Sequence, residues 1–517
     1  MGKIVAALTF VVHLAVVAFG PYGPHRDALL YYAMGEHLRL FAMDFPPFIA
    51  IVARAFTLFG NIELLTHVPI AAAHAALVVF AAAFARRSGG GHAVQAIAAL
   101  CIATAPVFLR TGSLFQPVVF DQLWWTAALW VLALVPAAAE PRRCWLTLGA
   151  VLGLGLLTKF TILVLGAAIL VAILATPERR ALRTRWPWLA GMLALLVGSP
   201  SIIGQIVLGW PFLKQVQDLA DVQLVHVSPV AFFAEQFLMV GPVLLFAVAA
   251  ALTTLRVRGA APTPARHEDD GLRLVVIAAL AAFVLMLLAR GKPYYIAPIW
   301  PALIGIGLGR LDVRLQHATS SRSARRVRAR TAAVAILWLL VVGWGAITLP
   351  LGLPVLPPEP MARYAGWLGA GTTTNTGAVI SLPQDYADML GWEEQVAAVE
   401  AAWASLSPEE QQRAVVLATN YGRAGAIDWF GGDALPDAIA PVGSYWFWGP
   451  GELPGEITIV AGEEASELEG SYFRSAQEFT RVRRPWGVPE ERDVPITIAR
   501  EPLAPLQQIW PRFEGVN

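Results

Sequence analysis

Three aspartates could carry chemistry because each lies beside the end of a hydrophobic segment. Asp27 lies in HRDALLYYAMGEHL, Asp44 lies in the following MDFPPF, and Asp121 lies near the start of the segment FDQLWWTAALW. Aspartates at such positions are often helix caps, because an acid is favoured at a helix N-terminus. Charge close to a bilayer is costly, however, and often serves a function. If the three share one side of a membrane, they could deprotonate a hydroxyl group or hold a divalent cation.

A second set of residues carries positive charge near the same kind of boundary. Lys159 interrupts a long hydrophobic run, while Arg290 and Lys292 lie in the short sequence RGKPYY, which ends in Tyr294 and Tyr295. Such side chains often only extend toward lipid headgroups. Together they resemble a phosphate-binding rim, since arginine can form paired hydrogen bonds and lysine supplies a point charge. An acidic set facing such a rim suits a phosphorylated lipid donor and a hydroxyl acceptor.

The composition limits the class of protein to which these residues belong. The chain has 517 residues, of which 56% are hydrophobic and 15% are charged, whereas soluble proteins contain about 25% charged residues. It is therefore a membrane protein with several spans. A net charge of +1 argues against a nucleic-acid partner. Two cysteines in or beside hydrophobic segments, Cys101 and Cys144, offer neither a disulfide framework nor a structural zinc site.

The number of spans depends on the run 146–175. A membrane-spanning helix needs about 20 residues, and one helix over this run would be about 45 Å long against a hydrocarbon core of about 30 Å. Basic clusters occur at 86–87, 142–143, 179–185, 256–273 and 314–330. The positive-inside rule places all of them in the cytoplasm only if the run 146–175 crosses twice, with Lys159 at the outer turn. We therefore predict about eleven spans. The other segments are roughly 4–20, 64–85, 94–109, 120–139, 188–207, 232–255, 272–289, 294–309 and 332–351.

This topology predicts which parts of the chain lie outside the cytoplasm. The first external loop covers residues 21–63, and the loop 208–231 and the region from about residue 352 follow on the same side. The short turns at 110–119 and 290–293 are external as well. The topology therefore places Asp27, Asp44 and Asp121 on the same side of the membrane as Lys159, Arg290 and Lys292.

Hydropathy falls after residue 351, which predicts a transmembrane domain over 1–351 and a small soluble domain over 352–517. The runs AVISLP (378–383), AVVLATN (414–420) and EITIVAG (456–462) are typical of short strands. Residues 391–405 predict a helix, and SPEE from Ser407 predicts the start of another. The pattern indicates a small α/β domain. It could be a structural cap or could take part in substrate binding.

Several motifs resemble those of one superfamily. The first-loop sequence HRDALLYYAMGEHL with DFPP, then FDQLWWTAALW, GLGLLTKFT and GKPYYIAPIWPAL, are similar to motifs of protein O-mannosyltransferases and aminoarabinose transferases, which are GT-C glycosyltransferases. The tail motifs LPQDYADMLGWEE and NYGRAGAIDWFGG resemble a bacterial branch of family-39-like enzymes. The resemblance covers nearly the whole chain, and its motifs are specific for the superfamily rather than for a substrate.

The resemblance implies a GT-C fold and a multi-pass enzyme of the bacterial inner membrane, with its C-terminal domain in the periplasm. Such an enzyme transfers a sugar, with inversion, from a polyprenyl-phosphate donor to a hydroxyl group of a lipid, glycan or protein acceptor. The implied catalytic acids are Asp27, Asp44 and Asp121. The implied donor-phosphate residues are Lys159, Arg290, Lys292, Tyr294 and Tyr295, and the implied acceptor-side residues of the first loop are His25, Arg26 and Tyr31.

One position departs from the pattern of the relatives, which usually carry an acidic pair where this chain has Asp27-Ala28. Either Asp44 supplies the second carboxylate, or metal binding and the fine mechanism differ. No cofactor is required, and a divalent cation would be an optional one. Two other interpretations stay open: a transporter or flippase for lipid or sugar, and a non-catalytic relative whose tail serves for docking.

Overall fold

The computed structural model describes residues 1–222, 224, 228–256, 264–318, 324–369, 373–374, 376–432 and 435–513. Parts of the predicted loop 208–231 and of the basic clusters 256–273 and 314–330 lie outside this description. The chain divides into two compact units. We call residues 1–18, 67–203 and 218–353 the helical unit, and residues 19–66, 204–217 and 354–517 the sheet unit.

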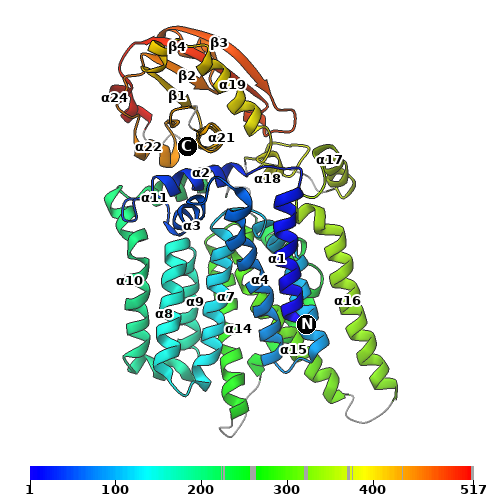
Figure 1. Ribbon diagram of the computed structural model, residues 1–517. Coiled ribbons are helices and arrows are strands. Elements are labelled where there is room, and N and C mark those ends of the chain that lie inside the picture. Colours follow the sequence, from blue (N-terminus) through cyan, green and yellow to red (C-terminus); the bar gives the residue numbers. More distant parts are fainter. Residues whose placement is uncertain are drawn as a thin grey trace. The chain divides into compact units, whose positions relative to one another are not determined.

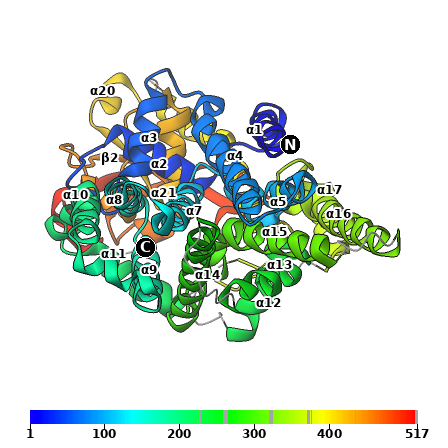
Figure 2. The ribbon, with the colours of Figure 1, turned by 90° about the horizontal axis from the view of Figure 1, so that it is seen from below.

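The helical unit consists of apolar helices whose long members run roughly parallel to one another in Figure 1, and Figure 2 shows the same helices from below. A helix satisfies every backbone polar group internally, which is the requirement for crossing lipid. The helices are α1 (Gly2–Phe19), α4 (Glu63–Arg87), α5 (His92–Thr104), α6 (Pro106–Thr111), α7 (Val118–Leu134), α8 (Pro141–Thr158), α9 (Ile162–Leu174), α10 (Trp186–Val207), α12 (Pro229–Val240), α13 (Val243–Ala251), α14 (Pro264–Leu288), α15 (Trp300–Ala318) and α16 (Ala324–Gly352).

The predicted class, a helical membrane protein with several spans, is confirmed. Among the described residues, seven helices are long and apolar enough to cross a membrane, and the number rises to nine if each of two sharply bent helix pairs is one span. Every predicted hydrophobic segment coincides with a helix or a helix pair. Some of these helices are short, such as α5 with 13 residues, so the figure of about eleven crossings stays a prediction.

The run 146–175 is broken as predicted. α8 ends at Thr158 and α9 begins at Ile162, with Lys159 in an extended conformation between them. A Cβ atom on Gly155 would lie 2.5 Å from Cγ1 of Ile162, so the two helices come very close directly at the turn. A single helix of about 45 Å is therefore excluded, whereas the side of the membrane on which Lys159 lies stays a prediction.

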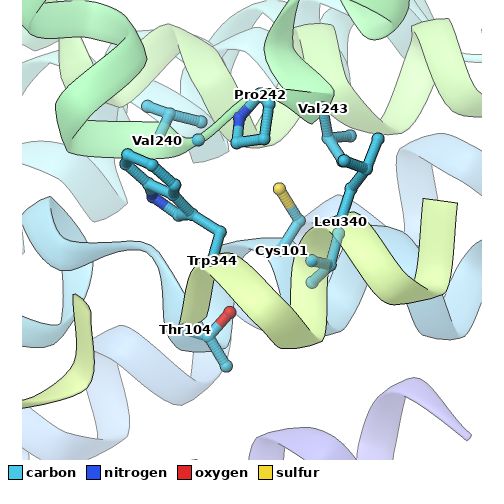
Figure 3. Close-up of a pocket in the computed structure, with 9 residues that line it drawn as sticks. Cys101, Thr104, Val240, Pro242, Val243, Leu340 and Trp344 are labelled. Carbon is cyan, nitrogen blue, oxygen red and sulfur yellow. The ribbon is translucent and has the colours of Figure 1, made fainter. Parts of the chain in front are cut away.

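A second break lies between α12 and α13, which are bent by 108° at Gly241-Pro242. Gly241 has a φ of +105°, and a Cβ atom there would lie 2.7 Å from the indole of Trp344. The bend borders a small apolar pocket, shown in Figure 3, to which Cys101 and Thr104 also contribute. None of the predicted site residues lines this pocket.

The sheet unit combines the first loop with the tail of the chain. Its four strands are β1 (Ala414–Ala418), β2 (Ile457–Ala461), β3 (Phe473–Arg483) and β4 (Asp493–Pro502), in the order β1-β2-β4-β3. β1 and β2 are parallel, and β4 is antiparallel to both of its neighbours. The helices of the unit include α2 (Arg26–Glu36), α3 (Phe48–Thr57), α17 (Pro358–Trp367), α18 (Gln384–Ala387), α19 (Trp392–Ala404), α20 (Pro408–Gln411), α21 (Tyr421–Phe430) and α22 (Gly443–Trp448).

Most of the predicted elements of the tail are confirmed, including the strands at 414–420 and 456–462 and the helix at 391–405. α20 starts with the capping box of Ser407 and Glu410. The strand predicted at 378–383 is wrong, because Val379 forms only an isolated bridge to Thr373 and Pro383 leads directly into α18. β3 and β4 were not predicted: β3 is an edge strand with mostly polar, exposed side chains, and the buried apolar run of β4 was not recognised as a strand.

A buried ionic cluster connects the elements of the sheet unit. Glu491, of which 2% is exposed, accepts hydrogen bonds from Asn420 Nδ2 (2.7 Å), Arg423 Nε (3.1 Å) and Arg484 Nη1 (2.9 Å). The Arg484 guanidinium lies 4.2 Å from the ring centroid of Trp392. One carboxylate thus compensates two buried guanidinium groups and joins α21 to α19 and to the region between β3 and β4.

We expect the substitution Glu491→Gln to destabilise the protein by about 3 kcal/mol, because it leaves two buried cations without their counter-charge. Thermal unfolding of the full-length protein in detergent would measure the change. The matched control is Glu456→Gln, which breaks an exposed pair with Arg413 and should cost less than about 1 kcal/mol. Equal effects of the two substitutions would contradict a structural role for the cluster.

Candidate functional site

Asp27 lies in the first turn of α2, but it does not cap this helix. The N-cap is His25, whose Nδ1 accepts the backbone N–H of Asp27 at 3.0 Å. The His25 side chain is almost completely buried, whereas the Asp27 side chain is 31% exposed. The cap function is thus provided by the histidine, and the carboxylate of Asp27 points to other partners.

One of these partners is Tyr421, the first residue of α21. Its hydroxyl group donates to Oδ1 of Asp27 at 3.0 Å. Burial, together with the negative charge of Asp27, raises the pKa of the Tyr421 phenol above its ordinary value. The phenol therefore keeps its proton and acts as the donor in this hydrogen bond.

The tail also supplies acidic groups beside the start of α2. Nη1 of Arg26 lies 3.9 Å from Oδ1 of Asp388, and Nε2 of His25 lies 3.9 Å from both Asp385 and Asp388. The backbone N–H of Arg26 donates to the carbonyl of Asp388 at 3.0 Å. Burial raises the pKa of Asp388, while the nearby Arg26 opposes this rise. The third predicted acceptor-side residue, Tyr31, lies one turn after Asp27 on α2 and is half-buried.

Two glycines allow α21 to reach this position. A Cβ atom on Gly422 would lie 2.3 Å from Cγ of Arg26, and one on Gly425 would lie 2.7 Å from the backbone of Leu29. At Gly425 the backbones of the two helices are therefore in contact, and at Gly422 the Arg26 side chain lies against α21. Both helices are found in the same region of Figure 1. The small residues of NYGRAG thus bring Tyr421 to Asp27.

Asp44 is also held by the tail. The hydroxyl group of Ser444 on α22 lies 2.9 and 2.8 Å from the two carboxylate oxygens. The backbone carbonyl of Asp44 accepts a hydrogen bond from Nε2 of Gln205. Burial raises the pKa of Asp44 to about 6, and the hydrogen bond from Ser444 opposes the rise.

Asp121 belongs to the helical unit, where it lies in the first turn of α7 and is buried. Its carboxylate accepts a hydrogen bond from Oγ1 of Thr161 at 2.9 Å, and it interacts electrostatically with Lys159. Trp124 donates to Thr158 at 3.0 Å from the same end of α7. Asp121 and Lys159 therefore meet at the break between α8 and α9.

The two predicted tyrosines lie at this break as well. Nζ of Lys159 is 4.3 Å from the ring centroid of Tyr295 and 5.4 Å from that of Tyr294. Distances of this order allow cation–π attraction. Arg290 and Lys292 lie on the turn just before the tyrosines, where Arg290 is exposed with a φ of +52°.

The turn that carries these residues is fastened by buried hydrogen bonds. Gln236 on α12 donates to the carbonyl of Pro293 at 3.1 Å and accepts from the indole of Trp300 at 3.0 Å. Four of the predicted phosphate residues thus lie on or beside a fixed turn of the helical unit, while Lys159 lies at the break between α8 and α9. Asp27 and Asp44 belong to the other unit. That the three aspartates form one acidic site therefore stays a prediction.

Within the described residues, no group of three or more His, Cys, Asp or Glu side chains is arranged to hold a metal ion. The optional divalent cation therefore has no assigned ligands here. Three neighbours of the first loop were not predicted from the sequence: Tyr421, Asp388 and Ser444. Their motifs were visible in the tail, but nothing in the spacing indicates that they approach residues almost 400 positions earlier.

Comparison with known proteins supports the predicted fold. A family model described as dolichyl-phosphate-mannose-protein mannosyltransferase matches residues 44–203. The structure of ArnT from Cupriavidus metallidurans in the apo state is similar over 96% of this chain and 97% of its own, with 16% identity and a TM-score of 0.57. The same protein bound to undecaprenyl phosphate gives a TM-score of 0.56 at the same identity and coverage. No curated protein sequence matches the chain.

A more distant similarity extends to an oligosaccharyltransferase from Archaeoglobus fulgidus, tethered with an acceptor peptide, with 13% identity and a TM-score of 0.50. It covers 90% of this chain and 69% of the other. The predicted GT-C fold, with a helical membrane unit and a small C-terminal sheet domain, is thereby confirmed.

The raised pKa of Asp44 leads to a test by pH. Its folded-state pKa of about 6 lies above the ordinary value, so ionisation of Asp44 lowers stability as the pH rises from about 4 to about 6. The variant Asp44→Asn cannot ionise, so we expect it to gain stability relative to the wild type as the pH rises from 4 to 7. Thermal unfolding at several pH values would measure this difference, with Asp221→Asn, at an exposed site, as the control. A difference that does not change with pH would contradict the assignment.

Proposed function

We propose that this GT-C protein is a membrane glycosyltransferase that moves a sugar from a polyprenyl-phosphate donor to a hydroxyl group of a lipid, glycan or protein acceptor. The reaction takes place at the outer face of the bacterial inner membrane, with the tail of the chain in the periplasm. The donor class rests on the family model named for a dolichyl-phosphate-mannose enzyme. It also rests on ArnT, which has been crystallised with undecaprenyl phosphate.

The observation that carries the proposal is the environment of Asp27. Its helix is capped by another residue, its carboxylate is partly exposed, and one of its oxygens is held by a hydrogen bond. A carboxylate that is oriented but still accessible suits a general base.

The proposed reaction is a single displacement. Asp27 accepts the proton of the acceptor hydroxyl group while that oxygen forms a bond to the anomeric carbon of the sugar. The bond from this carbon to the phosphate oxygen breaks, and its electron pair leaves with the lipid phosphate. Attack from the opposite face inverts the configuration of the sugar.

Lys159, Arg290 and Lys292 are proposed to stabilise the charge that develops on the departing phosphate. Asp121 and the tyrosine rings hold Lys159 in place beforehand. A cation positioned before the reaction costs no reorganisation when the charge appears. Such a displacement needs a base for the acceptor hydroxyl group and cations for the donor phosphate. Asp27 supplies the first, and the three basic residues supply the second.

The substitution Asp27→Asn should lower sugar transfer by about 10²–10⁴-fold, because an amide cannot accept the proton. The measurement is mass spectrometry of envelope glycolipids and glycoproteins from a deletion strain complemented with wild type or variant. Unchanged thermal unfolding of the variant would separate lost chemistry from lost folding. Near-normal transfer would overturn the role of Asp27.

Lipid scrambling by the wild type in liposomes, without any sugar transfer, would contradict the proposed function.

The substitution Lys159→Gln should raise KM for the polyprenyl-phosphate donor by about tenfold or more, since a charged hydrogen bond to phosphate is lost. Initial rates in proteoliposomes at varied donor concentration would measure it. Lys214→Gln on α11 (Pro211–Val222) removes an exposed lysine and serves as the control. Equal KM values for the two variants would exclude Lys159 from donor binding.

A further inference from the structure

The hydrogen bond between Tyr421 and Asp27 joins residues 394 positions apart in the chain. It connects the first loop, which carries the proposed base, with a tail helix to which no role in the reaction has been given. A tail that only covered the first loop would not need to contact Asp27. Here the hydroxyl group of Tyr421 lies 3.0 Å from the carboxylate of Asp27.

The position of the phenol is fixed from several directions. α21 lies directly on α2 at Gly422 and Gly425, where no side chain larger than hydrogen fits. The guanidinium of Arg26 lies over the Tyr421 ring at 5.3 Å from its centroid. Behind Tyr421, Asn420 caps α21 and donates to the buried Glu491. The ring of Tyr421 is therefore held in place by the fold, and this brings its hydroxyl group to the carboxylate of Asp27.

We propose that Tyr421 is a positioning residue for Asp27, so that the tail of the chain completes the group that activates the acceptor. This inference rests on the proposed function and extends it. The donor to Oδ1 restricts rotation of the carboxylate, which fixes the direction in which the other oxygen faces. It also stabilises the ionised carboxylate, which is the form that accepts a proton.

Other titratable groups lie around the carboxylate of Asp27, and Tyr421 acts in their presence. His25 and Arg26 face it from the start of α2, with Nδ1 of His25 4.0 Å from Oδ2 of Asp27. Asp388 faces it from the segment after α18. These groups remain in place when only the hydroxyl group of Tyr421 is removed, so a change in proton uptake can be traced to the phenol.

The test is the substitution Tyr421→Phe in the full-length protein, which removes the hydroxyl group and keeps the ring. We expect kcat to fall by about tenfold or more, because a hydrogen bond to a charged group is lost. The acidic limb of the pH–rate profile should move to higher pH, and KM for the donor should stay unchanged. Rates are measured in proteoliposomes, with undecaprenyl-phosphate-linked mannose and aminoarabinose as donors and envelope glycolipid as the acceptor.

Two further proteins make the result decisive. Tyr472→Phe removes the hydroxyl group of an exposed tyrosine in the same unit and should change neither kcat nor the pH profile. If Tyr421→Phe fails to fold, 3-fluorotyrosine at position 421 keeps the shape and strengthens the donor, so the acidic limb should move to lower pH.

The failure of the inference can be told apart from the failure of the proposed function. If the wild type transfers sugar and neither change at position 421 moves the acidic limb, the role of Tyr421 is overturned while the function stands. If the wild type transfers neither sugar to any envelope acceptor, the proposed function falls and the inference falls with it.

Discussion

The packing of α21 on α2 is possible only because two glycines, three residues apart, face the first loop. Residues at this spacing share one face of a helix, so the pair creates a flat strip on which α2 can lie. Nearly everything about the candidate base depends on this contact. It sets the position of Tyr421 and brings Arg26 over the ring. The Glu491 cluster fixes the far side of α21.

In the helical unit, the charged residues of the candidate site lie at helix ends. Asp121 and Lys159 are placed where two helices end or begin, so each has a polar partner without leaving the apolar bundle. Charge in an apolar environment is tolerated when it is paired. The break between α8 and α9 thus has two effects: it divides a run too long for one span, and it places Lys159 and Thr161 beside Asp121.

Hydropathy and local motifs predicted much of the fold, but not the contacts between distant segments. The break at Lys159 followed from helix length, and β1, β2 and α19 followed from short apolar runs bounded by turn residues. β3 was missed because an exposed edge strand has no apolar pattern, and the apolar run of β4 was not recognised as a strand. The contacts of Asp27 and Asp44 with the tail were not predicted for another reason: no local property of Tyr421 or Ser444 indicates which loop it will contact. The predicted residues Lys159, Tyr294 and Tyr295 do meet, because a helix hairpin and a fixed turn carry them.

The sheet unit is assembled from three separate stretches of chain, and this has a consequence for synthesis. Asp27 leaves the ribosome 394 residues before its hydrogen-bond partner Tyr421. At about 5–20 residues per second, the interval is roughly 20–80 s. During this time the first loop has neither α21 nor Ser444 to pack against, while the helices between them are inserted. The loop must therefore stay soluble and unaggregated on its own, and the proposed base is assembled only when the last third of the chain arrives.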